Sequence, residues 1–416
     1  MKTLTIRNFG PIANCEIDVK NINVIIGRQS SGKSTIAKCL YYFIVLKDEL
    51  DNLTYESHHP GIMADGKGVS LYDKFRNRMK SLFLETFGFD TSMLKPDMCI
   101  CMRYSDYLYI QVRYNGRDLM FSYANSLNVF VEKLENRVYD STDSNIRTAV
   151  KNEINDFFNM DYSAVFIPAG RTIMTTIGTQ FSLFYSMLND TNKRLIDLCT
   201  RNYVETVMRI KPLFQNGLKS LLGYGYNESV IQKAQSFINK VINGDYHFAD
   251  GKEYLLLADG TKVDINYASS GQQESLWIFN ILLYYSVLGE KKFYIIEEPE
   301  SNLFPESQME ITQFIGLIAN EESPVFINTH SPYVLGELNN MIYAGSFKGE
   351  KQKKASEIIP MECQVQYSNV QSFFIENGEL TSTMDNEIEQ IDNLKLDGVS
   401  TVINDQYTRL LTIEQE

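Results

Sequence analysis

Residues 22–35 read INVIIGRQSSGKST. The first five form a short apolar run that is typical of a buried parallel strand, and the next eight match the pattern G-x-x-x-x-G-K-[ST]. From Lys33 to about Lys47, apolar residues recur at helical spacing. Strand, glycine-bearing loop and helix therefore follow one another directly, which is the context that a phosphate-binding loop requires. The sequence predicts an α/β fold of the P-loop type built around this unit.

The residue types in the loop have chemical reasons. The two glycines let backbone N–H groups close around an anion, where a Cβ would clash. Lys33 places a positive charge between the β- and γ-phosphates, and Ser34 offers its hydroxyl to Mg²⁺. The helix that follows directs its positive end at the phosphates. We therefore expect this loop to bind a nucleotide.

A second buried strand, formed by residues 293–296, ends in two carboxylates, Glu297 and Glu298. Adjacent residues at a strand end point to different sides, so the two can take different tasks. Glu297 would hold Mg²⁺ directly or through water, and Glu298 would accept a proton from the attacking water. A solvated acidic turn is the alternative, because Glu300 is close by. The apolar strand that leads into the pair favours a site.

Two further segments carry weaker signals. Residues 268–274, ASSGQQE, come just before a long apolar helix, where Ser269 could donate to a γ-phosphate and Gly271 would permit close approach. Taken alone, this segment is an ordinary helix N-cap. His330 follows a buried strand over 326–328, and a lone histidine there is more often structural than catalytic. Its place after the carboxylate pair indicates a contact to the γ-phosphate or the attacking water.

Taken in this order, the segments resemble the ATP-binding-cassette (ABC) superfamily, in its soluble branch with SMC, RecF and overcoming-lysogenization-defect (OLD) proteins. The resemblance rests on LTIRNFGPI, GRQSSGKST, SSGQQE, IIEEPESNLFP and NTHSP, and it spans nearly the whole chain. It implies ATP and Mg²⁺ as cofactors, Glu298 and His330 as catalytic residues, and Ser34 and Glu297 as metal ligands. Its Walker A loop and signature imply these nucleotide-binding residues: Gly27, Arg28, Gln29, Ser30, Ser31, Gly32, Lys33, Ser34, Thr35, Ser269, Ser270, Gly271 and Gln272.

The chain departs from the superfamily pattern at several positions. Ala268 and Ser270 replace the leucine and the first glycine of the signature L-S-G-G-Q, and Glu297 stands where aspartate is usual. No glutamine can be assigned to the Q-loop. Residues 167–171 occupy that region, and Arg171 is a candidate for a contact near the nucleotide.

The resemblance and the patterning together predict four parts. Residues 1–174 form ATPase lobe I, with a mixed sheet and an antiparallel meander that turns at Asn115-Gly116. Residues 175–222 form a compact helical insertion that Pro212 interrupts. Residues 223–349 form lobe II with the signature, the carboxylate pair and His330, and residues 350–416 form an extension with a hairpin around Asn377-Gly378.

The chain also resembles the stand-alone ATPase components of bacterial anti-phage systems such as Septu and PARIS, which control a separately encoded nuclease or toxin. This resemblance implies such an effector partner and a homodimer, or a higher oligomer, in which two chains sandwich ATP head to tail. A RecF-like DNA-repair ATPase that binds DNA directly is the alternative. A transporter motor domain fits less well, because the N-terminal strand pattern and the helical insertion suit the soluble branch.

Composition excludes several other classes. The 416 residues carry 39 basic and 52 acidic side chains, a net charge of −13, which gives no support to nucleic-acid binding along the whole chain. The longest apolar run, residues 276–288, is too short to cross a bilayer, so we expect a cytoplasmic protein without a membrane partner. The 416 − 330 = 86 residues after His330 contain no D-x-D pair for a Toprim nuclease, and four histidines are few for an HNH nuclease. The six cysteines contain no CxxC pair and are expected to be buried free thiols.

Overall fold

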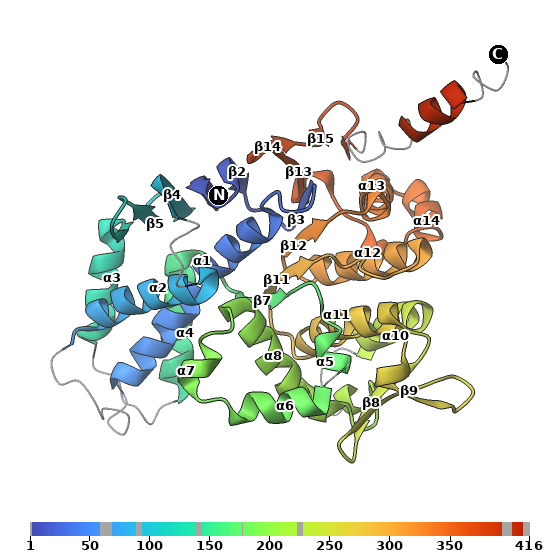
Figure 1. The fold of residues 1–416 in the computed structure, drawn as a ribbon, viewed down its shortest axis with the longest axis horizontal. Helices are drawn as coiled ribbons and strands as arrows, with labels where there is room; N and C mark the ends of the chain where they lie inside the picture. Colours follow the sequence, from blue (N-terminus) through green and yellow to red (C-terminus); the bar gives the residue numbers. More distant parts are fainter. Residues whose placement is uncertain are drawn as a thin grey trace.

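The structure is a computed structural model that describes residues 2–58, 69–88, 94–137, 144–176, 178–222, 228–392 and 402–410. Among these residues, an 11-stranded mixed sheet runs through the molecule (Figure 1). In spatial order its strands are β6 (Leu119–Tyr123), β5 (Leu108–Tyr114), β4 (Leu94–Ser105), β1 (Thr3–Phe9), β2 (Ile12–Asp18), β14 (Glu379–Ser382), β13 (Val370–Glu376), β3 (Ile22–Gly27), β12 (Val325–Thr329), β11 (Lys292–Glu297) and β7 (Ser163–Ile167).

The sheet has two differently built halves. Strands β13, β3, β12, β11 and β7 are parallel, and every residue of β3 is buried, as the apolar run predicts. The other half contains the predicted antiparallel meander, in which β5 and β6 are joined by a turn with Gly116 at a positive φ of 91°. The mixed α/β fold of a P-loop ATPase is therefore confirmed.

The hairpin around Asn377-Gly378 is also present, and it lies inside the central sheet. Asn377 and Gly378 have positive φ angles of 52° and 81°, which suits a tight two-residue turn between β13 and β14. Strand β13 pairs in parallel with β3, directly beside the strand that leads into the predicted phosphate loop. Residues of the predicted C-terminal extension thus complete the sheet of the ATPase lobes.

Helices cover both faces of the sheet (Figure 1). Successive strand residues alternate between two hydrophobic clusters, so that Val24 and Ile26 pack on one side and Ile25 on the other. The Ile25 side carries α1 (Lys33–His58), α2 (Leu71–Phe87), α3 (Asn125–Glu135) and α4 (Ser144–Phe158). The opposite side carries α8 (Leu198–Ile210), α10 (Glu228–Val241), α11 (Ser270–Val287), α12 (Pro305–Asn320) and α13 (Pro332–Ser346).

The remaining described elements are short or peripheral. They are α5 (Ile173–Thr176), α6 (Gly178–Met187), α7 (Asp190–Lys193), η2 (Lys211–Phe214), α9 (Lys219–Leu222), β8 (Asp245–Ala249), β9 (Lys252–Leu256), β10 (Lys262–Asp264), η3 (Ile265–Tyr267), α14 (Glu350–Ser356), η4 (Met361–Cys363), η5 (Tyr367–Asn369), β15 (Met384–Asp385), β16 (Gln390–Ile391) and a helix over residues 402–410.

The predicted helical insertion packs against the main core. Helix α8 ends at Ile210, and the chain continues as the 3₁₀ turn η2 with Pro212 near its start, as the proline predicts. Tyr203, Val207 and Ile210 are buried in the same cluster as Trp277 of α11. Segment 175–222 therefore supports one face of the sheet.

The cysteines follow the prediction only in part. All six are free, and four are buried, but Cys99 and Cys101 of strand β4 are partly exposed. Within the described ranges, no helix has both the length and the apolar composition that a membrane span needs.

Candidate nucleotide-binding site

Three of the predicted segments gather at the carboxyl ends of neighbouring parallel strands, and the signature segment is separate from them. Strand β12 lies between β3 and β11, and its Asn328 is in register with Ile25 on one side and Glu297 on the other. The phosphate loop after β3, the carboxylate pair at the end of β11 and His330 after β12 therefore share one edge of the sheet. Ligands of open parallel sheets bind at this edge.

The phosphate loop is closed around its own lysine. Lys33 is buried, and its Nζ donates hydrogen bonds of 2.9 Å to the carbonyl oxygens of both Gly27 and Arg28. Burial lowers the pKa of Lys33, and the negative charges of Glu298, Glu300 and Glu297 oppose that shift. Lys33 thus lies near Glu297 and Glu298, the carboxylate pair predicted for the same reaction, and near Glu300.

The two loop glycines are required for different reasons. A Cβ on Gly27 would lie 2.6 Å from the Cγ2 atom and 2.7 Å from the carbonyl oxygen of Ile375 in β13, so the loop passes too close to that strand for a side chain. Gly32 has a φ of +110°, which other residues rarely adopt. Between them, residues 28–30 are exposed, as is Ser34 at the start of α1.

Glu297 is buried but weakly held. Its Oε2 accepts a 3.4 Å hydrogen bond from the Ala169 backbone N–H, and its Oε1 accepts a 3.5 Å hydrogen bond from Asn328 Nδ2. Such long bonds leave lone pairs for another partner. Protein-bound Mg²⁺ commonly takes one or two carboxylates with phosphate oxygens and water, so Glu297 and the Ser34 hydroxyl suit that ion.

Glu298 points away from its neighbour because of an unusual backbone. Its φ is +45°, and its N–H donates a 2.8 Å hydrogen bond to the carbonyl of Asn328. Its Oε2 accepts from Ser301 Oγ at 3.1 Å, and its Oε1 lies 3.7 Å from Nε2 of His330. Both side chains remain partly exposed. The structure therefore brings the two predicted catalytic groups together.

His330 is kept neutral by its surroundings. Burial lowers its pKa, the charge of Lys33 lowers it further, and Glu298 acts in the opposite direction. A neutral imidazole has one donor and one acceptor nitrogen. His330 can therefore accept or donate a hydrogen bond near neutral pH.

Glu300 is a structural tie and not a solvated turn residue. Its Oε1 accepts hydrogen bonds from Thr329 Oγ1 at 2.8 Å and from the His330 backbone N–H at 2.7 Å. Burial raises the pKa of this carboxyl group. Glu300 thus fixes the loop after β11 to the loop that carries His330, a role that the sequence did not indicate.

Arg171 is bound to the backbone of the predicted carboxylate pair. Its guanidinium is fully buried and donates to the carbonyl oxygens of Glu297 at 2.6 Å and Glu298 at 2.9 Å. It also pairs with Glu274 of α11, with Nε 3.1 Å from Oε2 and 2.8 Å from the Glu274 carbonyl oxygen. These bonds direct the guanidinium toward protein groups, so Arg171 holds the backbone of the carboxylate pair.

Breaking the Arg171–Glu274 pair should cost much of the stability of the chain. Arg171→Met leaves Glu274 buried without its partner, and such single replacements typically cost about 3–5 kcal/mol. The double variant Arg171→Met/Glu274→Met should recover part of that loss, because neither charge then remains unpaired. Urea unfolding of the two single variants and the double variant measures this, and strictly additive losses would contradict the pairing.

The signature segment forms a helix cap on the surface. Ser269 Oγ accepts from the backbone N–H of Gln272, whose side chain accepts in turn from the Ser269 N–H at 2.8 Å, so the predicted N-cap is a full capping box. Ser269 and Ser270 are exposed. A Cβ on Gly271 would lie 2.6 Å from the carbonyl oxygen of Asn302, so the cap packs against the loop after the carboxylate pair.

The structure does not bring this cap to the phosphate loop of the same chain. Among the described residues, no hydrogen bond or ion pair joins residues 269–272 to residues 27–35. Two large side chains beside the cap are open to solvent, with Tyr267 85% and Phe304 69% exposed. The cap thus lies in an exposed surface that contains uncovered aromatic side chains.

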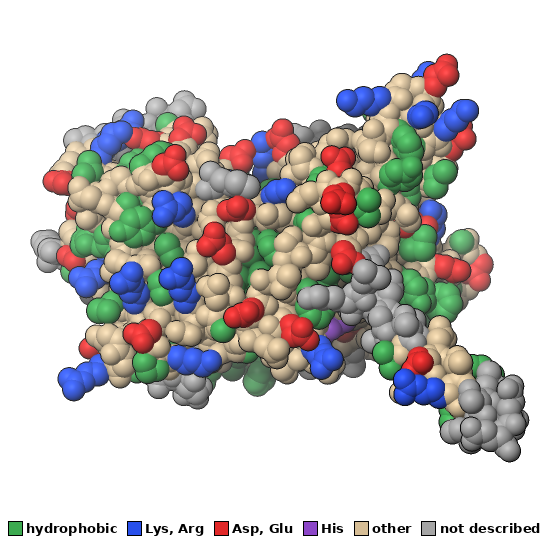
Figure 2. All heavy atoms as spheres, turned by 90° about the horizontal axis from the view of Figure 1, so that it is seen from above, with side chains coloured by type: hydrophobic (Ala, Val, Ile, Leu, Met, Phe, Trp, Pro, Cys, Tyr) green, Lys and Arg blue, Asp and Glu red, His purple; other side chains and the backbone are tan. Residues whose placement is uncertain are grey.

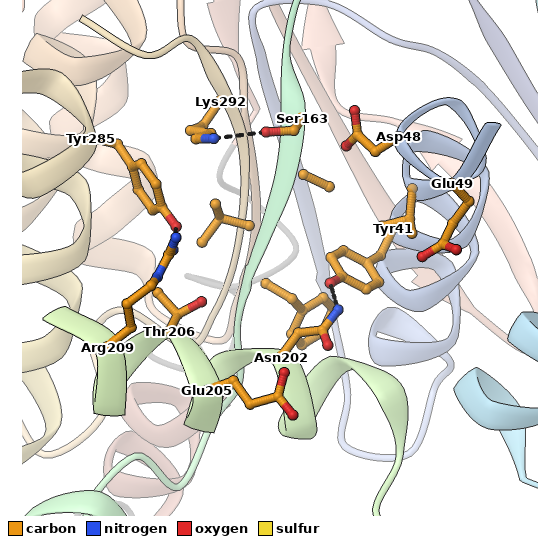
Figure 3. Close-up of a pocket in the computed structure, with 14 residues that line it drawn as sticks. Tyr41, Asp48, Glu49, Ser163, Asn202, Glu205, Thr206, Arg209, Tyr285 and Lys292 are labelled. Carbon is orange, nitrogen blue, oxygen red and sulfur yellow. Dashed lines mark hydrogen bonds between the residues drawn. The ribbon is translucent and has the colours of Figure 1, made fainter. Parts of the chain in front are cut away.

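A separate cavity of about 450 Å³ lies along β7, the last strand of the sheet (Figure 3). Tyr41 and Asp48 of α1 line one side of it, and Arg209 and Tyr285 line the other. None of the residues predicted to bind nucleotide lines this cavity. It is therefore distinct from the candidate site.

Comparison with known proteins gives one family. The family model described as AAA ATPase domain matches residues 1–160 and residues 70–335. No curated protein matches the chain. Among solved structures, the SMC head domain from Thermotoga maritima is 9% identical with a TM-score of 0.38, covering 91% of this chain and 97% of that chain. A structure of the SMC head bound to the C-terminal winged-helix domain of ScpA is 12% identical with a TM-score of 0.43, covering 93% and 98%.

Proposed function

The chain belongs to the AAA ATPase domain family, and from this premise we propose that it binds and hydrolyses ATP with Mg²⁺ at the edge formed by β3, β12 and β11. The observation that carries the proposal is the meeting of Lys33, Glu298 and His330 at that edge. A cation, a carboxylate and a neutral imidazole provide charge neutralisation, a proton acceptor and a positioning group for phosphoryl transfer to water.

In this mechanism each residue has one task. Lys33 exchanges its bonds to the loop carbonyls for phosphate oxygens, and Ser34 and Glu297 hold Mg²⁺, which would neutralise charge on the phosphates. Glu298 accepts the proton of the attacking water, while His330 orients that water or the γ-phosphate. Arg171 keeps the backbone of both carboxylates in place without touching the nucleotide.

We also propose that two chains complete each site. The exposed Ser269 cap is separate from its own phosphate loop, and Tyr267 and Phe304 beside it have no cover in one chain. A second chain placed head to tail would bring Ser269 to its partner's γ-phosphate and bury both aromatic side chains. Opening and closing of such a dimer with hydrolysis gives two states through which ATP could control a partner.

The proposed partner is a separately encoded effector, a nuclease or toxin of an anti-phage system. This part rests on the motif resemblance and on a site built for ATP turnover. Direct DNA binding in the manner of RecF is the competing role. Its signature would be ATPase stimulation by duplex DNA that falls steeply as salt rises, because each phosphate contact releases counterions.

Mixing two inactive variants tests the shared site. Lys33→Ala damages the phosphate loop, and Ser269→Arg blocks the cap, so each variant alone should hydrolyse ATP at less than about 1% of the wild-type rate. A mixed dimer has one intact phosphate loop facing one intact cap. The mixture should therefore regain activity well above the sum of its parts, in a steady-state phosphate-release assay.

The control for this experiment combines two variants whose defects lie in the same half of the proposed site. In a mixed dimer of Lys33→Ala and Glu298→Gln, each site has either a defective phosphate loop or a defective carboxylate, because both residues of a site come from the same chain. No activity should therefore return. Failure of the Lys33→Ala and Ser269→Arg mixture to recover would overturn the shared site and leave the single-chain roles of Lys33 and Glu298 standing.

A further inference from the structure

An apolar groove of about 570 Å³ runs between the second half of α13 and α14. Tyr343 of α13 and Phe347, just after its end, form one wall, and Ile358 and Ile359, just after α14, form the other. Tyr343 is 57% and Ile358 79% exposed. The groove is therefore a water-exposed apolar surface of the kind that binds another element.

Two lysines give the groove its charge. Lys351 and Lys354 line it, and neither makes an ion pair with any residue in the described part of the chain. An occupant with an apolar stripe and an acidic side chain beside it would complement both features. An amphipathic helix in a groove is a common way to satisfy such a surface.

The chain itself contains such a helix. Over residues 402–410, Ile403, Tyr407 and Leu410 follow the i, i+4, i+7 spacing of one helical face. All three are exposed, at 57%, 63% and 63%. Both views show this helix projecting from the body of the molecule (Figures 1 and 2). Residues 402–410 contain one acidic side chain, Asp405, and one basic side chain, Arg409.

The point of attachment puts the groove within reach. Asn339 of α13 holds strand β16, donating to the Ile391 carbonyl oxygen at 2.8 Å and accepting from the Ile391 N–H at 2.7 Å. Ser346, the last residue of α13, is seven residues further along the helix, about 10 Å away. The ten residue steps from Asp392 to Val402 can span up to roughly 35 Å.

We propose that the helix over residues 402–410 docks in the α13–α14 groove of its own chain, with Ile403, Tyr407 and Leu410 facing Tyr343 and Ile358. Asp405, whose present partner is Arg409 at 2.8 Å, then approaches Lys351 and Lys354. The tether raises the local concentration of the helix near its own groove far above that of a second copy.

Disulfide trapping in the full chain tests the proposal. The variant Ile358→Cys/Tyr407→Cys places one thiol in the groove and one on the apolar face of the helix. Copper phenanthroline with dissolved oxygen then oxidises the two thiols to a disulfide. The matched control is Ile358→Cys/Thr408→Cys, whose second thiol is one residue away on the polar face. We expect an intramolecular 358–407 disulfide, identified by mass spectrometry, to form about tenfold faster than the 358–408 disulfide.

A second change separates docking from chance collision. Ile403→Asp/Leu410→Asp, added to the first pair, alters only exposed side chains and should remove the tenfold preference while leaving the fold intact. Equal rates for positions 407 and 408, or no cross-link at either, would overturn docking by the apolar face. Cross-linked dimers in place of cross-linked single chains would overturn the assignment to the same chain and indicate exchange between copies.

Discussion

A chain carrying Glu298→Gln is expected to bind ATP as the wild type does and to hydrolyse it about 100-fold more slowly or worse. Glutamine keeps the size of the side chain and can still accept from Ser301 Oγ, so the loop should keep its shape. It cannot take a proton from water at neutral pH. Single-turnover phosphate release, with affinity measured by a fluorescent ATP analogue, separates the loss of chemistry from any loss of binding.

The same variant should accumulate as a closed dimer with ATP, because the step that opens the pair is lost. Light scattering with and without ATP measures the mass. Glu132→Gln, an exposed change on α3, is the matched control and should leave rate and mass unchanged. Turnover by Glu298→Gln at the wild-type rate would show that another group accepts the proton.

Lys33→Ala should lower the affinity for ATP by about 100-fold or more. A charge-assisted hydrogen bond contributes about 1.5–3 kcal/mol, and this lysine would make more than one bond to phosphate. Its present partners are backbone carbonyls of the loop, so the variant also removes the bonds that keep the empty loop closed. Isothermal titration with ATP in Mg²⁺ buffer measures the loss.

Lys80→Ala, on an exposed position of α2, controls for the removal of one positive charge from the chain. Thermal unfolding of both variants shows whether the fold is kept. If a folded Lys33→Ala chain bound ATP with wild-type affinity, the phosphate loop would not be part of the ATP-binding site. This conclusion would hold whatever the result for Glu298.

The sequence was sufficient for those parts of the site whose chemistry is local. The loop 27–34 needs glycines, a lysine and a hydroxyl next to one another, and an apolar strand leading into Glu297 and Glu298 identifies the carboxylate edge. Such motifs can be predicted from sequence because each depends on a few adjacent residues. The parallel strands β3, β11 and β12 followed from the same short apolar runs.

The parts that the sequence did not give depend on distant partners. Arg171 is separated by more than a hundred residues from Glu274, and only the fold reveals that its guanidinium binds the carbonyls of Glu297 and Glu298. From the sequence alone, Glu300 is compatible with a solvated turn. In the structure it accepts hydrogen bonds from Thr329 and His330 and so connects the loops after β11 and β12. The pairing of β13 with β3 could not be predicted either. Val370 is in register with Ile22, 348 residues earlier, and nothing local in residues 370–376 specifies so distant a partner.

The residues of the signature segment are compatible with two different roles, and the sequence cannot distinguish them. A capping box and a γ-phosphate contact require the same residue types, a serine followed by small and amide side chains at a helix start. The structure accounts for every one of them within a single chain as a cap. Whether Ser269 has a second use is therefore a question about two chains, which the mixing experiment addresses.

The contact between Gly27 and Ile375 has a consequence for biosynthesis. Strand β3 is made long before residues 370–376, yet those residues supply one of its two flanking strands. A growing chain synthesised only as far as His330 already contains the phosphate loop, the carboxylate pair and the histidine. It still lacks strand β13, which packs against the loop at Gly27. The candidate site is therefore complete only once translation has passed Glu376, because a shorter nascent chain lacks the strand that packs against Gly27.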